Sequence, residues 1–229
     1  MKEAPSPNFD ERAGSRGPDM LVLHYTGMPT FEESLRRMTD PASKVSAHYL
    51  VDEGGQVTRL VAEDKRAWHA GVSFWKGETD INSRSIGIEI QNPGHEFGYR
   101  VFPEAQIAGV IALCRDILSR HDIPAERILG HADVAPARKQ DPGELFPWKT
   151  LAQAGIGLWP EGVEKPETGD VDIRTLQERL VAFGYDIKVT GEDDDQTRAV
   201  VTAFQRHWRQ NKVDGIADAE TLAILRALS

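Results

Sequence analysis

This 229-residue sequence has a single cysteine, and it lacks long apolar runs and an excess of positive charge. Its one cysteine, Cys114, rules out an internal disulfide, so any metal site would have to use histidine and carboxylate side chains. No stretch approaches the roughly 18 consecutive apolar residues that a membrane span needs. The 27 Lys+Arg against 36 Asp+Glu leave a formal net charge of -9, the wrong sign for binding nucleic acid through its phosphates. A disulfide scaffold, a membrane span and a nucleic-acid partner are therefore excluded.

What remains is an ordinary globular composition, with 40% hydrophobic and 28% charged residues. The length suits one medium domain followed by a small one. Residues 159–169, rich in Pro, Gly and Glu, have the composition of a linker. We therefore predict domains at 1–158 and 170–229, joined by a linker at 159–169, with few contacts across the boundary.

Alternating patterns predict strands in the first domain. Residues 20–25 form a strand that places Leu21 and Leu23 on one face and His24 on the other. Residues 47–61 predict two strands joined by a glycine turn. These strands are expected to pair in one sheet.

A further predicted strand carries a carboxylate side chain. In the predicted strand 85–90 the isoleucines face a core, and Glu89 faces the opposite side. One helix is predicted to start at Thr30, and a long amphipathic helix covers residues 103–121. Cys114 lies on the apolar stripe of that helix, so we predict a core residue and not a nucleophile.

Three apolar stripes after the linker predict a compact three-helix bundle. They fall within residues 173–183, 200–208 and 222–228. The acidic run at 192–195 is predicted to be a solvated helix start that complements the helix dipole.

Histidine and carboxylate side chains offer a candidate metal site. A hydrolytic zinc ion takes about three nitrogen or oxygen ligands from the protein and keeps one position open for water. His24 ends a predicted strand, and His131 and Asp141 bracket part of an irregular, proline-containing stretch at 131–147. Loops of this length are usually functional. The spacing matches no short generic zinc signature, so the pattern by itself leaves a metal site open.

Six short blocks follow one another in the first domain: LHYT at 23–26, SAHYL at 46–50, WHAG at 68–71, SIGIE at 85–89, GHAD at 130–133 and RKQDPG at 138–143. Together they resemble the type 2 N-acetylmuramoyl-L-alanine amidases, the AmpD/AmiD-like enzymes that share their fold with peptidoglycan recognition proteins. The resemblance spans about residues 20–151. It implies an α+β fold with a mixed β-sheet flanked by helices and a metal groove at one edge, followed here by the small all-α three-helix domain.

The resemblance also implies roles for single residues. His24, His131 and Asp141 would hold one Zn2+ per chain, which would lower the pKa of its water and polarise an amide carbonyl. Glu89 would take the proton of that water and pass it to the leaving amine, and Lys139 would stabilise the oxyanion. The implied reaction is hydrolysis of the amide bond between N-acetylmuramic acid, or its 1,6-anhydro form, and L-alanine in peptidoglycan or muropeptides.

The other histidines have plainer interpretations. His48 and His69 could line the cleft, and a hydrogen-bonded structural histidine is an equally good interpretation of each. His95, His121 and His207 stand in polar or amphipathic contexts and are predicted at the surface.

Two rival functions fit parts of the pattern. A peptidoglycan recognition module would bind muropeptides without cleaving them, but non-catalytic relatives lose a metal ligand and this chain keeps all three. A lysozyme-like glycosidase needs a suitably placed pair of acids, and none can be singled out. We therefore predict a peptidoglycan or muropeptide hydrolase.

The second domain carries blocks of its own: TLQ at 175–177, LVAFGY at 180–185, TRAV at 197–200, FQ at 204–205 and VDGIA at 213–217. Over about residues 170–228 they resemble the peptidoglycan-binding type 1 module, which implies a polymer-binding tether. Ala217 replaces the usual glycine, and the loop at 190–193 is unusually acidic. Because of the loose linkage, we expect the first domain to fold and act without this tether.

Two features bear on location. Residues 1–19 are polar and show no export signal, which predicts a cytoplasmic recycling enzyme. The wall-binding module favours the periplasm as the alternative. We expect the cytoplasmic location, since export normally requires an address.

Overall fold

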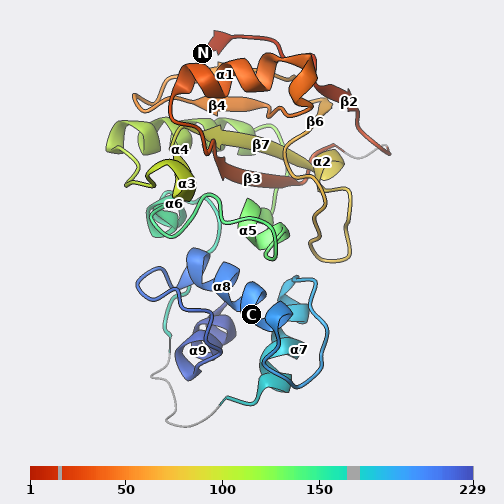
Figure 1. Ribbon diagram of the computed structural model, residues 1–229, viewed down its shortest axis with the longest axis vertical. Coiled ribbons are helices and arrows are strands. Elements are labelled where there is room, and N and C mark those ends of the chain that lie inside the picture. Colours follow the sequence, from red (N-terminus) through yellow and green to blue (C-terminus); the bar gives the residue numbers. More distant parts are fainter. Residues whose placement is uncertain (15–16, 164–170, 229) are drawn as a thin grey trace.

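The computed structural model describes residues 1–14, 17–163 and 171–228. It has the predicted α+β fold, a mixed sheet flanked by helices and followed by a helical domain (Figure 1). Residues 164–169 of the predicted linker lie outside the described residues. Of the helices in the described part of the chain, none is both long and apolar enough to cross a bilayer.

The main sheet is mixed, because all neighbouring strands run parallel except the antiparallel pair β4 and β5. In spatial order its strands within the described residues are β1 (Lys2–Glu3), β5 (Val57–Arg59), β4 (Tyr49–Val51), β7 (Ser85–Ile90), β3 (Met20–Tyr25) and β8 (Ile128–Gly130). A separate antiparallel ribbon pairs β2 (Phe9–Glu11) with β6 (Lys65–Ala67). The two strands predicted within residues 47–61 are β4 and β5.

Helix α4 (Glu104–Leu118) covers one face of the sheet. Leu21 and Leu23 of β3 and the isoleucines of β7 form one apolar cluster with the buried stripe of this helix. Cys114 belongs to that cluster and is fully buried, and burial raises the pKa of its thiol to about 12. The prediction of a core cysteine is confirmed.

The opposite face of the sheet is covered partly by helix α1 and partly by the helical domain. Helix α1 (Phe31–Thr39) begins after the predicted cap Thr30, whose side chain accepts from the backbone N–H of Glu33, and it packs over β4. Met20 and Val22 of β3 pack instead in a cluster with the helical domain. Short segments complete the first domain: α2 (Ile81–Arg84), α3 (Gly94–Phe97), α5 (His131–Val134), α6 (Trp148–Gln153) and single 3-10 turns at Pro41–Ser43 and Ala125–Arg127.

The second domain is the predicted three-helix bundle. Its helices are α7 (Ile173–Phe183), α8 (Asp195–Trp208) and α9 (Ala219–Ala227). An aspartate caps each of them by accepting the backbone N–H three residues further on: Asp172, Asp194 and Asp218. The acidic run before α8 is therefore a helix start, as predicted.

The two domains share one hydrophobic core, so the prediction of few contacts across the boundary is wrong. Trp75 of the first domain is fully buried and meets Phe183 and Tyr185 edge-on, with ring centroids 5.8 and 5.0 Å apart. Figure 1 shows α8 lying directly against α5. Linker composition constrains only the connecting segment, whereas apolar side chains on the two facing surfaces decide whether the domains dock.

Candidate metal centre and active site

The three predicted ligands meet at the β8 edge of the sheet. Nδ1 of His24 lies 2.9 Å from Nδ1 of His131, and each nitrogen lies 3.0 Å from Oδ2 of Asp141. All three residues are buried. Within the described residues no other group of three or more histidine, cysteine or carboxylate side chains could hold a metal ion.

The parallel sheet explains this convergence. β3 and β8 are parallel neighbours, so their carboxyl ends lie at the same edge and deliver His24 and His131 to one place. The chain then returns through the irregular loop, where the backbone N–H of Ala132 donates to the carbonyl of Asp141 at 2.9 Å. That bond closes the loop and brings the aspartate back beside the start of α5.

The far nitrogen of His131 determines its tautomer. Nε2 lies 3.0 Å from the carbonyl oxygen of Ala70, which can only accept a hydrogen bond. In the neutral imidazole Nε2 therefore carries the proton, and Nδ1 presents a bare lone pair to Asp141.

A chain of three hydrogen bonds determines the tautomer of His24. The hydroxyl of Ser85 donates to the carbonyl of Ile81 at 2.6 Å, so its oxygen accepts from Nε2 of His69 at 3.2 Å. Nδ1 of His69 must then accept from Nε2 of His24, at 3.0 Å. Burial lowers the pKa of His24 to about 4 and that of His69 well below its usual value, so both rings are neutral at pH 7. Nδ1 of His24 is therefore also a bare lone pair.

Three candidate ligand atoms, two imidazole nitrogens and one carboxyl oxygen, consequently face one another at 2.9–3.0 Å. Burial acts to raise the pKa of Asp141, but the adjacent histidines outweigh it and lower that pKa, so the third atom is a carboxylate oxygen. Their lone pairs repel one another, and a proton or a metal ion held among the three atoms offsets that repulsion. Two imidazole nitrogens and one carboxylate oxygen form a donor set that Zn2+ accepts, with a position left for water.

Glu89 lies beside this set. It pairs with His24 in the register of β7 and β3, so the two side chains share a sheet face. Its Oε2 is buried without a hydrogen-bond partner among the described residues. Burial, reinforced by the charge of Asp141, raises the Glu89 pKa well above its usual range. Lys139 is close enough to act electrostatically on both Glu89 and His24. The structure thus places Glu89 beside His24 and Lys139 within electrostatic range of both, and their catalytic roles stay a prediction.

The two histidines with open interpretations are both buried. His69 packs against β7 where Gly87 has no side chain, since a Cβ there would lie 2.5–2.7 Å from the ring atoms. His48 accepts the backbone N–H of Gly87 and lies 3.0 Å from the carbonyl of Lys65. His48 is therefore structural, whereas His69 is a hydrogen-bonded residue that also holds a candidate ligand.

The surface prediction is right for His95 and wrong for His207. His95 is exposed and stacks on Tyr99, and His121 is partly buried. His207 is only 2% exposed, lies within 3.7 Å of both the Trp148 and Trp208 ring centroids, and bonds Asp133. The missed signal is its spacing, because position 207 follows Phe204 by three residues and Val200 by seven on the buried stripe of α8. Asp133, which stands in the GHAD block, received no predicted role.

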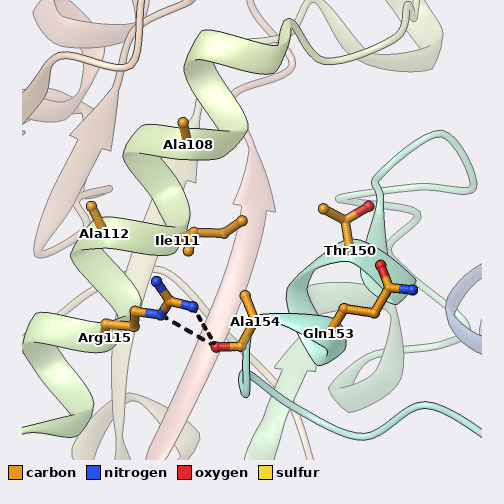
Figure 2. A pocket seen from close by; sticks show the side chains of 7 residues that line it. All are labelled: Ala108, Ile111, Ala112, Arg115, Thr150, Gln153 and Ala154. Carbon is orange, nitrogen blue, oxygen red and sulfur yellow. Dashed lines mark hydrogen bonds between the residues drawn. The ribbon is translucent and has the colours of Figure 1, made fainter.

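A surface pocket on the α4 side of the molecule is not part of this centre (Figure 2). It is lined by Ala108, Ile111, Ala112, Arg115, Thr150, Gln153 and Ala154. Its one charged side chain, Arg115, donates to the carbonyl of Ala154 (Figure 2). The pocket contains neither histidine nor carboxylate, so it offers no groups for metal-assisted hydrolysis.

Comparisons with known proteins agree with this geometry. A family model described as "N-acetylmuramoyl-L-alanine amidase" matches residues 14–144, and one described as "Putative peptidoglycan binding domain" matches residues 169–225. The chain is 43% identical over 229 residues to the N-acetylmuramoyl-L-alanine amidase AmiD of Escherichia coli (strain K12), covering 91% of this chain and 81% of that relative. It is 32% identical over 166 residues to the 1,6-anhydro-N-acetylmuramyl-L-alanine amidase AmpD of Haemophilus influenzae, covering 65% of this chain and 88% of that relative.

Two solved structures have similar folds over nearly the whole chain. One is the complex of AmiD from E. coli with the substrate anhydro-N-acetylmuramic acid-L-Ala-D-gamma-Glu-L-Lys, with a TM-score of 0.84, 41% identity and coverage of 96% of this chain and 91% of that chain. The other is AmpDh3 from Pseudomonas aeruginosa in complex with anhydromuramic pentapeptide, with a TM-score of 0.82, 34% identity and coverage of 98% and 97%. From the convergent donor set, the fold and these similarities it follows that the chain belongs to the N-acetylmuramoyl-L-alanine amidase family.

Proposed function

We propose that this protein is a zinc-dependent amidase that hydrolyses the bond between N-acetylmuramic acid and L-alanine. The observation that supports it best is the convergence of candidate ligand atoms from His24, His131 and Asp141, next to Glu89, whose Oε2 is buried without a hydrogen-bond partner among the described residues. A muropeptide-binding module would need neither a cation site nor a buried acid beside it. The family to which the chain belongs supplies the substrate class.

The chain's own residues would hold the metal in a fixed orientation. His69 holds Nε2 of His24, and the carbonyl of Ala70 holds Nε2 of His131, so both Nδ1 atoms face Asp141. When bound, zinc supplies a Lewis acid that lowers the pKa of water and polarises an amide carbonyl. The carboxylate of Asp141 offsets part of the positive charge.

Glu89 would move the proton. Its raised pKa makes the ionised carboxylate a stronger base than an exposed glutamate, as a group that accepts a proton from water needs to be. Oε2 would take the proton of the attacking water and deliver it to the amine of L-alanine as the bond breaks. The ammonium group of Lys139, which acts electrostatically on Glu89 and His24, would stabilise negative charge on the former carbonyl oxygen.

Product masses test this proposal. The purified chain is incubated with 1,6-anhydro-muropeptides and with purified sacculi, before and after zinc removal by a chelator. We expect free stem peptide, no release from the metal-free chain, and recovery on adding zinc. A shortened glycan would identify a glycosidase, unchanged material with retained binding would identify a recognition module, and full activity without metal would contradict the zinc mechanism.

We propose anhydro-muropeptides as one substrate, because both solved structures named above are complexes with anhydromuramic peptides. Comparing release rates on anhydro-muropeptides and on sacculi measures the preference between soluble fragments and polymer. The cytoplasmic location stays a prediction, and fractionation of cells that produce the native protein would test it.

A further inference from the structure

A buried carboxylate next to the metal centre is not used by the proposed mechanism. Asp133 lies in α5, two residues after His131, and is 2% exposed. Its Oδ2 accepts from the backbone N–H of Gly130 at 2.8 Å and from Nδ1 of His207 at 2.7 Å. Its Oδ1 accepts from the hydroxyl of Tyr185 at 2.8 Å. Two of these three donors belong to the second domain.

The second domain also contacts the segment that carries Asp141. Gln210, just beyond α8, donates through Nε2 to the carbonyls of Glu144 at 2.7 Å and Phe146 at 2.6 Å. Arg206 of α8 donates to Oε1 of Gln140 at 3.1 Å. These contacts fall on both sides of Asp141 in the sequence. The segments that carry His131 and Asp141 are therefore both fastened to α8.

Backbone contact and core packing hold the second domain against the first. The backbone N–H of Lys76 donates to the carbonyl of Gly184 at 2.9 Å. Gly184 has a φ of +145°, and a Cβ there would lie 2.8–3.0 Å from Trp75 and Lys76, so the two domains touch where only glycine fits. The second domain is docked by backbone contact and by a shared core, which leaves its donors little freedom to leave Asp133.

We propose that the second domain is part of the metal centre, with Tyr185 and His207 as positioning residues that act through Asp133 on the turn that bears His131. Asp133 anchors the first turn of α5 only while its own charge is satisfied. Without the two donors from the second domain, the buried carboxylate keeps one hydrogen bond and must move towards water, taking the turn with it. The inference rests on the proposed zinc site, because it assigns the domain a role in holding a ligand of that site.

The experiment compares two tyrosines in the full-length chain. Tyr185→Phe removes only the hydroxyl that reaches Asp133. The control, Tyr49→Phe, alters another buried tyrosine, whose hydroxyl donates to Glu63 at 2.6 Å and which packs on the α4 face of the sheet, opposite the ligands. For each variant the zinc dissociation constant is measured by competition with a chelator, and the melting temperature is measured on the metal-free chain. We expect Tyr185→Phe to raise the zinc Kd about tenfold and Tyr49→Phe to leave it unchanged, while both lower the melting temperature.

Two further variants keep the test independent of folding failure. His207→Phe retains a ring between Trp148 and Trp208 but loses the donor to Asp133, and Gln210→Ala removes a half-buried amide that holds the loop after Asp141. We expect each to weaken zinc binding severalfold, with His207→Phe adding little to Tyr185→Phe, since both act on one carboxylate.

The outcomes separate this inference from the proposed function. If the unaltered chain binds no zinc, the proposed function itself fails. If it binds zinc and Tyr185→Phe has the same Kd as Tyr49→Phe, the second domain is only a packed neighbour and the inference is overturned. A Kd that rises for Tyr185→Phe alone supports positioning through Asp133.

Discussion

The two faces of the main sheet differ in kind, and strand β7 shows the contrast within six residues. The isoleucines at positions 86, 88 and 90 face α4 and belong to an apolar cluster. Its side chains need close packing but no hydrogen-bond partners. Gly87 and Glu89 face the other way, towards histidines, carboxylates and the second domain. One face stabilises the fold, and the other requires each polar group to be held by a specific neighbour.

The polar face is therefore the more demanding of the two. Removing a methyl group from the α4 face leaves a small cavity, whereas removing a donor from the polar face leaves a buried polar atom unsatisfied. Its order also depends on residues from distant parts of the chain, from His24 to His207. The experiments below test how far that dependence extends.

Ending the chain at residue 163 should have the largest effect. The change exposes Trp75 to water and leaves Asp133 with one donor, a loss that for a buried pair is on the order of 3–5 kcal/mol. We expect a much lower melting temperature and loss of turnover on soluble muropeptides, measured by calorimetry and product masses. An unchanged melting temperature and turnover would instead restore the view of the second domain as a removable tether.

Glu89→Gln should separate chemistry from metal binding. The substitution removes the proton-transfer group next to His24 but not a ligand, so we expect turnover to fall about 10²–10⁴-fold with zinc still bound. Metal analysis and steady-state kinetics give the two readings. The control Glu63→Gln changes a carboxylate bonded to Tyr49 and should keep turnover. If zinc content falls in Glu89→Gln, Glu89 is a ligand and its proposed role is wrong.

His69→Phe tests the chain of hydrogen bonds behind the ligand. It keeps a ring against Gly87 but removes the atom that accepts from Nε2 of His24. Loss of such an outer partner weakens metal affinity by about tenfold or more. Chelator competition measures this, with His121→Gln, which alters a histidine bonded to Glu63, as the control. Equal zinc affinities would show that His24 needs no outer partner.

The smallest effect concerns the stability of the metal-free chain against pH. The folded pKa of Glu89 is raised, so its favourable contribution is complete below the unfolded value of about 4.3 and is lost as pH rises through the folded pKa. Glutamine cannot lose a proton. We expect Glu89→Gln to melt with the unaltered chain near pH 4 and a few degrees above it near pH 8. Parallel melting curves across this range would contradict the raised pKa.

Periodicity was sufficient for the apolar face. Alternation in β3 and β7 and the 3.6-residue stripe of α4 each identify which side chains point into the core, because burial of hydrocarbon depends only on position along an element. Cys114 lies on that stripe and is buried, as the period predicts. The ligand set could not be predicted in this way, because residues 24, 131 and 141 have no common period. Strand adjacency brings them together in the fold, and in the sequence only the resemblance to a family indicated them.

The domain contact could not be predicted in the same way. The segment 159–169 has the composition of a linker, yet the facing surfaces bury Trp75 and Tyr185 together. Asp133 and His207 stand 74 positions apart and each looks polar in isolation. Their pairing follows from docking of two finished domains, and a local pattern contains no information about which surfaces will meet.

The single thiol of the chain offers a chemical measurement of opening. A cysteine reacts with alkylating reagents as its thiolate, and Cys114 is fully buried with a pKa of about 12. A folded molecule at neutral pH is therefore unreactive towards such reagents, while a molecule that has exposed the α4 face is labelled once. The labelling rate measures how often the α4 face becomes exposed. Comparing the rates with and without zinc would show whether metal binding on the opposite face changes how often the α4 face opens.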